Sequence, residues 1–398
     1  MKKVFTRFVP FLLFSSLSSY AQIPGLTPEK SWDLNGYVKY MATSTIPNSG
    51  ETIFDNIVHQ RFNFEYRFND QLRVNLGMRN RLLFGDSAEY SNYGDFISYD
   101  PGYVDLSKNW IDKKGVVGNS QFDRAYLNWN KDDWQFRAGR FRINWGMTTV
   151  WNPNDIFNSY SIYDFDYEER PGTDAIMVSK KLGFASSIDL VFNPNSDSEL
   201  DSYAARYLFN KQGWDMQVLL GKSQLDYVVG AGFAGDIYGA GLRGEFSWFE
   251  PTQESYQSQN STQQEELIAS SVSSIEMDYR FDGTQNWVIQ GSLMHISEPQ
   301  DADNAMAYLN LPLSARTLSF THWTWYSSLG MDLSPLSRLT FMNSYYDDGS
   351  FFVGVNQTYS LADDWQLIGV VQYFDGASDS VFGENPSTLL YAQIKWSF

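Results

Sequence analysis

The residue types that most often carry catalysis give little signal in this sequence. Histidine occurs at only three positions, His59, His295 and His322. None of them lies in a metal-ligand spacing such as His-Glu-x-x-His. Serines and aspartates are so frequent that no pairing with a histidine singles out a nucleophile and its base. The sequence therefore indicates no catalytic residue, no metal site and no cofactor, and a hydrolase is only a remote alternative.

Arginines offer a different chemistry, because a guanidinium group binds and steers anions. Nine of them lie between Asn56 and Trp145: Arg61, Arg67, Arg73, Arg79, Arg81, Arg124, Arg137, Arg140 and Arg142. Five acidic residues follow: Asp155, Asp164, Asp166, Glu168 and Glu169. A basic wall that faces acidic side chains would set ion selectivity in a pore. The alternative is that the arginines form structural ion pairs with carboxylates such as Glu65 and Asp123.

The segment 139–158 holds the densest group of these candidates. It follows a run in which apolar and polar side chains alternate, which predicts that a strand ends there. The alternation slips at Gly139, which predicts a β-bulge and places Arg140 and Arg142 on one face. Further on, Asn152 precedes a proline in a sequence typical of turns. The segment therefore leaves a strand and enters a loop rich in aromatic and acidic residues.

A long loop with several aromatic side chains is expected to bury them instead of extending into water. We predict that Asn144–Asn158 folds into a barrel lumen, with Trp145 and Trp151 as rigid walls. Asp155 is expected to pair with an arginine or to face one across the pore. The residues predicted to line the pore or its constriction are Arg61, Arg73, Arg79, Arg124, Arg137, Arg140, Arg142, Asn144, Trp145, Trp151, Asn152 and Asp155. The alternative for this segment is a structural corner.

The elements that would position these residues are strands. From Asn56 to Phe68, polar side chains alternate with apolar ones, which is the period of a strand with two different faces. In a soluble sandwich the apolar face would point inward, whereas in a membrane barrel it meets lipid. The chain has 398 residues, 17 % aromatic and only 19 % charged, which favours the barrel. Its net charge of −18 argues against nucleic acid as a partner.

Short and long connections alternate along the chain, as in bacterial outer-membrane barrels. Short turns are predicted at Asn69-Asp70, Asn130–Asp132, Leu182-Gly183, Asn210–Gln212, Asp282–Asn286, Leu333–Ser337 and Ser360–Asp364. Longer connections are predicted at Phe84–Ser120, Asn144–Gly172, Asn193–Asp201, Phe249–Ala269, Ser297–Arg316 and Gly376–Pro386. The hairpins from Trp32 to Phe398 predict an all-β fold, a transmembrane antiparallel barrel of about 18 strands, with 16 as the alternative.

The N-terminus has the pattern of a secretory signal peptide. Basic residues, Lys2 and Arg7 among them, precede a short apolar run, and a small-x-small sequence ends at Ala21. The apolar run is far shorter than the roughly 20 residues of a spanning helix, which argues against a membrane anchor. We therefore predict a signal peptide at 1–21 and a single barrel domain at 22–398.

The last residues of the chain form an alternating strand that ends on Phe398. Leu390, Ala392, Ile394, Trp396 and Phe398 fall on one face, and Tyr391, Gln393 and Lys395 on the other. This strand resembles the C-terminal signal of outer-membrane barrels, and the resemblance implies recognition by the barrel-assembly machinery. The residues assigned to that signal are Tyr391, Ile394, Trp396 and Phe398. The alternative is an ordinary edge strand.

The segment 139–158 also resembles the Gly-Arg…Asn-Trp-Gly…Trp-Asn-Pro-x-Asp signature of poorly characterised porin-like outer-membrane barrels of Gram-negative bacteria. The resemblance implies a protein of the outer membrane, in contact with its lipid and lipopolysaccharide. It further implies a passive channel for small polar solutes, with no enzymatic activity. The solute and the oligomeric state stay open. The alternative is a non-transporting barrel that assembles or anchors a surface polymer.

Overall fold

The computed structural model describes residues 30–159, 161–163, 170, 172–257, 265–302, 304–309 and 313–398. The predicted signal peptide lies outside these residues, as do Asp164, Asp166, Glu168 and Glu169. The part from Trp32 to Phe398 forms one compact unit. In the described part of the chain, no helix has the length and apolar character needed to cross a membrane.

The described residues form strands almost throughout. The strands are β1 (Trp32–Pro47), β2 (Ile53–Arg67), β3 (Leu72–Gly85), β4 (Ser107–Lys113), β5 (Val116–Lys131), β6 (Trp134–Phe141), β7 (Thr173–Gly183), β8 (Ser186–Asn193), β9 (Ser202–Lys211), β10 (Trp214–Ser223), β11 (Asp226–Ile237), β12 (Ala240–Pro251), β13 (Ser255–Tyr256), β14 (Glu265–Glu266), β15 (Ser270–Arg280), β16 (Val288–Ile296), β17 (Trp323–Ser334), β18 (Ser337–Tyr346), β19 (Ser350–Ala362), β20 (Trp365–Gly376) and β21 (Ser387–Ser397). The short helices are η1 (Ser87–Glu89), α1 (Tyr93–Ser98), η2 (Ser198–Leu200) and α2 (Ala305–Leu309).

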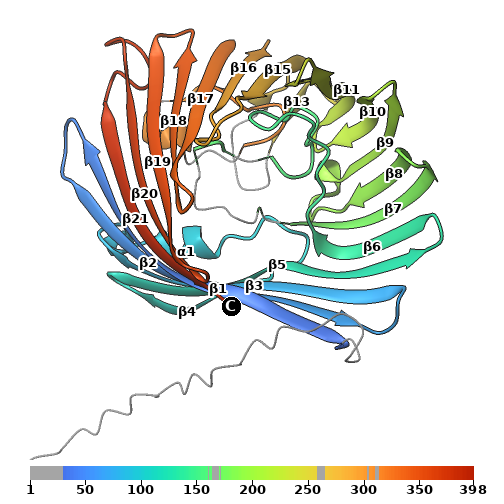
Figure 1. Ribbon diagram of the computed structural model, residues 1–398, viewed down its shortest axis with the longest axis horizontal. Coiled ribbons are helices and arrows are strands. Elements are labelled where there is room, and N and C mark those ends of the chain that lie inside the picture. The colour runs from blue at the N-terminus through green and yellow to red at the C-terminus, as the bar shows by residue number, and fades with distance from the viewer. Residues whose placement is uncertain are drawn as a thin grey trace, which may run out of the picture. The chain divides into compact units, whose positions relative to one another are not determined.

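The main sheet closes on itself. It contains 19 strands, each antiparallel to its neighbours, and β21 pairs with β1. Strand β4 pairs only with β5, so 18 strands form the closed ring that Figure 1 shows. A closed ring leaves no open sheet edge, which is the condition for a sheet to cross a bilayer. The predicted 18-stranded antiparallel barrel is therefore confirmed.

The two faces of the wall differ as the alternation in the sequence predicted. In β2, Arg61 and His59 are 1 % and 5 % exposed, whereas Val58 on the other face is 36 % exposed. In β21, Gln393 is buried while Ile394 is exposed. Polar side chains thus face the lumen and apolar ones face outward, the arrangement of a transmembrane barrel and not of a soluble sandwich.

The prediction of a β-bulge at Gly139 is wrong. The pairing of β6 with both neighbours continues through Gly139 without a shift in register. The residue instead has a φ of +118°, and an added Cβ would lie 2.3 Å from the carbonyl oxygen of Ala125. The slip in alternation therefore comes from a backbone conformation that only glycine adopts easily. The register shift in this part of the wall lies in β5, where Asp123 is the extra residue opposite Gly77 and Met78.

The long connection predicted over Phe84–Ser120 joins the ring strands β3 and β5, but it contains a strand of its own that the sequence did not predict. This stretch contains β4 and the first residues of β5, joined by a tight turn at Gly115. β4 pairs with the same part of β5 that β3 pairs with on its other side. β4 therefore pairs with the part of β5 that extends beyond the end of β6 at Phe141.

The terminal residue completes the closure of the barrel. The backbone of Phe398 exchanges two hydrogen bonds with Gly36 in β1, both 3.0 Å long. Its ring lies 5.3 Å from that of Trp396 and 6.1 Å from that of Phe62. These aromatic side chains form a cluster on the outward face at the end of the barrel with short turns.

Phe398→Asp is expected to reduce the amount of assembled barrel, because it puts a carboxylate into this outward aromatic cluster. Phe398→Trp, which keeps an aromatic ring, should assemble normally. The measurement is the fraction of heat-modifiable protein in the membrane fraction of cells that express each variant. Equal assembly of Phe398→Asp and the parent chain would contradict the proposed role of this residue.

Candidate functional site

The described residues 144–158 of the β6–β7 connection lie inside the barrel, against the inner face of β10, β11, β12 and β15. In Figure 1 they form the blue-green to green chain within the ring. Gln217 in β10 donates to the carbonyl of Trp145, and Ser274 in β15 donates to the carbonyl of Trp151. Asn154 donates to the carbonyl of Ala231 in β11. The segment Asn144–Asn158 is thus attached to the lumenal face of several consecutive strands, as expected for a loop that buries its aromatic residues.

Two lumenal glutamates hold this segment through its backbone. Glu245 in β12 accepts hydrogen bonds from the N–H groups of Met147, Thr148 and Asn154, the last two at 2.7 and 2.9 Å. Glu245 is 4 % exposed, so these charge-assisted bonds compensate a carboxylate that has lost its water. The first turn of the segment therefore wraps around one carboxylate.

Glu276 in β15 holds the next residues. It accepts from the N–H groups of Thr149 and Val150, at 2.8 and 3.0 Å, and from the hydroxyl of Thr149 at 2.8 Å. Arg243 in β12 also donates to Glu276, at 3.0 Å. Four successive N–H groups, from residue 147 to residue 150, thus point at two carboxylates.

Aromatic side chains complete the attachment of the segment. The guanidinium of Arg206 in β9 lies 5.3 Å from the centre of the Trp145 ring. Trp151 makes an edge contact with Tyr326 in β17, at 6.1 Å between ring centres. Both tryptophans are buried, and Asn152 is buried with them and bonds to Thr148. Trp145, Trp151 and Asn152 therefore build the interior of the segment, and their side chains do not line open water.

A second group of aromatic residues lies against the opposite wall. Tyr163, from the same connection, packs on Phe352 and Phe374 in β19 and β20 at 4.6 and 5.6 Å between ring centres. Tyr308 of α2 and Phe382, from the β20–β21 connection, join the same cluster. Three connections from the end with long loops thus meet inside the barrel and fill part of its lumen.

Arg140 is buried among carboxylates at the end of β6. Its guanidinium pairs with Asp174 in β7 through two bonds of 2.7 and 2.8 Å, and with Asp100 at 2.6 Å. It also donates to the carbonyls of Val104 and Phe122, which lie in the segment before β4 and in β5. Its side chain is 3 % exposed. This position favours the structural alternative for Arg140, which joins β5, β7 and the residues before β4 where β6 ends.

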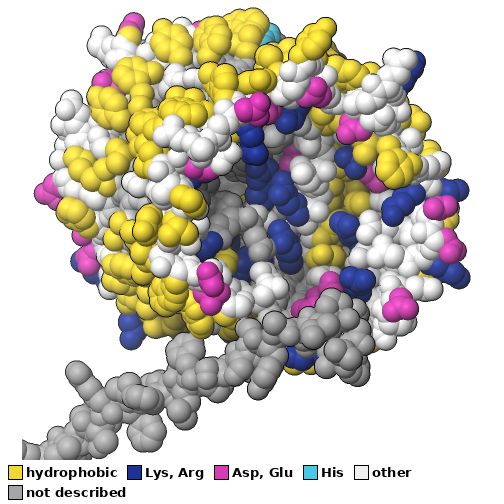
Figure 2. All heavy atoms as spheres, in the orientation of Figure 1, with side chains coloured by type: hydrophobic (Ala, Val, Ile, Leu, Met, Phe, Trp, Pro, Cys, Tyr) yellow, Lys and Arg dark blue, Asp and Glu magenta, His cyan; other side chains and the backbone are white. Residues whose placement is uncertain are grey.

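Other predicted arginines also have lumenal partners. Arg61 pairs with Asp123 at 2.5 Å, and both are buried. Arg73 lies 3.6 Å from Glu65. Arg79 bonds to Gln121 and Arg124 to the carbonyl of Arg170. Figure 2 shows dark-blue Lys and Arg side chains around the hollow of the barrel. Several of the predicted arginines are therefore neutralised by carboxylates, Asp123 and Glu65 among them.

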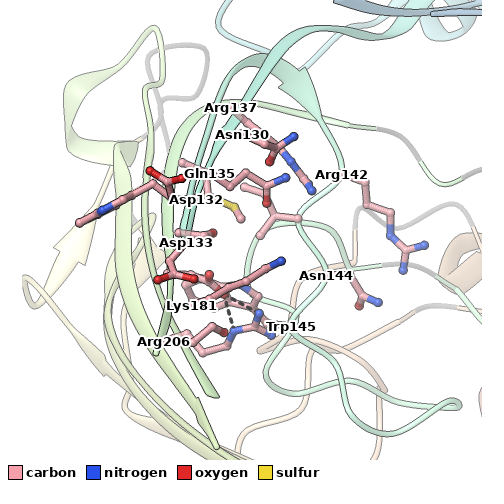
Figure 3. A pocket seen from close by; sticks show the side chains of 16 residues that line it. Asn130, Asp132, Asp133, Gln135, Arg137, Arg142, Asn144, Trp145, Lys181 and Arg206 are labelled. Atoms are coloured by element: carbon pink, nitrogen blue, oxygen red, sulfur yellow. Dashed lines mark hydrogen bonds and ion pairs between the residues drawn. The ribbon is translucent and has the colours of Figure 1, made fainter. Parts of the chain in front are cut away.

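Arg137 and Arg142 differ from these arginines. Within the described residues, neither has a carboxylate at ion-pair distance, and the Nε atom of each is buried without a hydrogen-bond partner. Arg137 lies 5.9 Å from the centre of the Phe141 ring. Both line a cavity of about 430 Å³ that Asn144, Trp145, Lys181 and Arg206 also line. Figure 3 shows these side chains around one space, with Arg206 beside Trp145.

The same cavity contains acidic side chains at its edge. Asp132 and Asp133, from the β5–β6 turn, and Asp189 in β8 contribute to its lining. Asp189 is already paired with Arg206, at 2.5 Å. The cavity therefore lies at the end of the barrel with short turns, and it brings together two guanidinium groups that have no carboxylate partner among the described residues.

The side chain of Asp155, within this segment, is enclosed and pairs with no arginine in the described structure. It is fully buried, and neither carboxylate oxygen has a hydrogen-bond partner within the described residues. Burial raises the pKa of Asp155 to about 7, and the nearby Glu245 acts in the same direction, whereas the charge of Arg142 lowers it. The carboxyl group therefore keeps its proton to a much higher pH than an exposed aspartate does.

Comparisons with known proteins follow the fold. The chain is similar to solved structures of OpdQ and of the outer membrane protein OprD, both from Pseudomonas aeruginosa, and of OccAB1 from Acinetobacter baumannii. The TM-scores are 0.56, 0.54 and 0.54, at 8 %, 9 % and 10 % sequence identity. This chain is covered to 93 %, 92 % and 92 %, and the other chains to 99 %, 94 % and 97 %. The chain has a porin fold. No family model matches the sequence, and no curated protein does.

The sequence did not indicate which residues of this porin-fold barrel hold the segment Asn144–Asn158. Glu245 and Glu276 lie on the lumenal faces of their strands, and alternation could have placed them there. Their partners are about a hundred residues away in the sequence, however, so no local signal indicates the contact. Asp100 and Asp174, the partners of Arg140, were missed for the same reason.

Arg140→Ala is expected to destabilise the barrel, because it leaves Asp100 and Asp174 buried without their cation. Breaking a buried ion pair from one side costs about 3–5 kcal/mol. The measurement is the temperature at which the heat-modifiable band is lost on a gel. Arg67→Ala is the matched control, since its pairs with Asp33 and Glu65 are partly exposed and should contribute less. An unchanged transition in Arg140→Ala would contradict the structural role.

Asp155 gives the barrel a predictable pH dependence. Because its pKa is raised in the folded state from 3.8 to about 7, folding favours the protonated form. Its contribution to stability is present below about pH 4 and is lost as the pH rises to about 7. Asp155→Asn should remove this loss, so that at pH 8 the variant melts at a higher temperature than the parent chain, while at pH 4 the two agree. Equal melting temperatures of the parent chain and Asp155→Asn at pH 8 would contradict the raised pKa of Asp155.

Proposed function

We propose that this protein is a channel of the outer membrane that passes small polar solutes and prefers anions. The porin fold supports this proposal, and so does the outward apolar surface, which suits contact with lipid. One of the similar structures, OprD, is described as an outer membrane protein. The proposed channel has no enzymatic role.

The observation that carries the proposal is the pair Arg137 and Arg142. Most lumenal arginines described above have a carboxylate, amide or carbonyl partner, whereas these two face a cavity without one. An unpaired guanidinium attracts an anion strongly where protein excludes much of the water. The adjoining Asn144, which is exposed, offers amide surface to the rest of a polar solute. An anionic solute would thus replace the missing carboxylates as it passes.

The alternative, a non-transporting barrel for surface-polymer assembly or anchoring, has one observation in its favour. The aromatic cluster of Tyr163, Tyr308 and Phe382 fills part of the lumen beside β18–β20. A barrel that does not conduct needs such a plug, whereas a channel needs a path beside it. Single-channel conductance of the purified barrel in planar bilayers separates the two functions.

Arg137→Ala combined with Arg142→Ala should shift the reversal potential in a salt gradient toward cation selectivity. The double variant removes two positive charges that no described carboxylate neutralises. Arg137→Lys with Arg142→Lys, which keeps the charges, should retain most of the anion preference. The measurement is the reversal potential across a planar bilayer with a tenfold salt gradient.

Lys114→Ala is the matched control for net charge. Lys114 lies in the exposed β4–β5 turn and pairs with Glu89, away from the lumenal cavity. This variant should leave the reversal potential unchanged. A double arginine variant that conducts with the parent chain's selectivity would show that Arg137 and Arg142 do not set it.

A further inference from the structure

Asp155 and Arg142 are two residues of opposite charge type in the β6–β7 connection that do not pair with each other. Asp155 is 0 % exposed, and neither of its carboxylate oxygens has a hydrogen-bond partner among the described residues. Arg142 is half-buried, and its Nε atom has no partner in the same part of the chain. A buried carboxylate without a cation or hydrogen bonds is costly. The unpaired arrangement therefore suits an Asp155 that carries its proton.

The backbone holds these two residues near each other. The N–H group of Ile143 donates to the side-chain oxygen of Asn158 at 2.9 Å, a bond that is itself buried. The rings of Trp145 and Phe157 are in edge contact, 5.2 Å apart between their centres. The stretch just after β6 and the later part of the segment thus lie side by side. A long arginine side chain on the first can reach a carboxylate on the second.

The charged groups around Asp155 come from the connection itself and from β12. Burial has the largest effect and raises the pKa of Asp155 to about 7. The positive charges of Arg142 and Arg170 lower this pKa, and the negative charge of Glu245 in β12 raises it. Among these three charges, that of Arg142 has the largest effect. The backbone N–H and carbonyl groups of Asp155 are both hydrogen-bonded, so a new partner requires side-chain rotation only.

We propose that Asp155 sets how many guanidinium groups the lumenal cavity offers to a passing anion. While Asp155 is neutral, Arg142 faces the cavity on the side of Asn144, as in Figure 3, and acts there together with Arg137. When Asp155 loses its proton, the buried carboxylate needs a cation, and Arg142 turns to pair with it. Only Arg137 then remains for the anion, so the anion preference falls as the pH rises. Asp155 is thus a positioning residue, and its role rests on the proposed anion channel.

Reversal potentials at two pH values test this role. In a planar bilayer with a tenfold salt gradient, the purified parent chain should be more anion-selective at pH 5.5 than at pH 8.5. Asp155→Asn cannot ionise, so it should show the parent's pH 5.5 selectivity at both pH values. Arg142→Ala should show one lower selectivity at both pH values, equal to that of the parent at pH 8.5. Each single variant reports independently, so either one decides if the other does not fold.

Asp363→Asn is the matched control for the loss of one carboxyl group. Asp363 lies exposed in the β19–β20 turn, and the variant should follow the parent at both pH values. A merely structural Asp155 would change the melting temperature in Asp155→Asn and leave the pH dependence of selectivity intact, which would overturn the proposed role. A pH dependence that Arg170→Ala abolishes and Arg142→Ala does not would overturn it as well.

The parent chain tells this inference apart from the proposed function. A parent that prefers anions equally at pH 5.5 and pH 8.5 would overturn the role of Asp155 and leave the anion channel standing. A parent that does not conduct, or that has no anion preference at pH 5.5, would overturn the proposed function and the role of Asp155 together.

Discussion

The interior of this barrel depends on two carboxylates, Glu245 and Glu276, that bind the backbone of the β6–β7 connection. Buried carboxylates are costly unless they are fully hydrogen-bonded, and loop N–H groups are costly inside protein unless they find acceptors. Here the two glutamates accept hydrogen bonds from the N–H groups of residues 147–150 and 154, so the carboxylates and the loop N–H groups are satisfied together. The shape of the lumen, the burial of Trp145 and Trp151 and the enclosure of Asp155 all follow from that attachment.

The lumenal arginines divide into those that pair with carboxylates in the wall and those that face a cavity. Arg61 and Arg140 are enclosed by carboxylates and keep strands together, the second at the point where β6 leaves the wall. Arg137 and Arg142, only a few residues away, face a cavity without a carboxylate partner in the described residues. Arginines that are close in the sequence therefore differ in their surroundings. Arg140 lies beside carboxylates of the wall, whereas Arg137 and Arg142 lie beside a cavity.

A polar side chain needs a hydrogen-bond partner on either face of the wall, but the available partners differ between the two faces. In the lumen, polar side chains meet water, solute or one another, so unpaired groups there are open to a ligand. On the outward face a polar side chain has no water to bond, so its partners there are other side chains of the wall, as when Gln357 donates to Ser337 and Asn56 accepts from Tyr40. The same residue type is therefore interpreted differently on the two faces, and only the register separates them.

The sequence by itself determined the strands, their two faces and the closed barrel, because side-chain alternation is a local property that the bilayer fixes through one apolar face. It also indicated that the segment 139–158 turns inward, since its aromatic residues have to be buried. It named Glu65 and Asp123 as carboxylates that arginines could pair with, but it did not assign the individual pairs, the role of Glu245 or the conformation at Gly139. Those depend on contacts between strands far apart in the sequence and on their exact register, which only the tertiary structure decides.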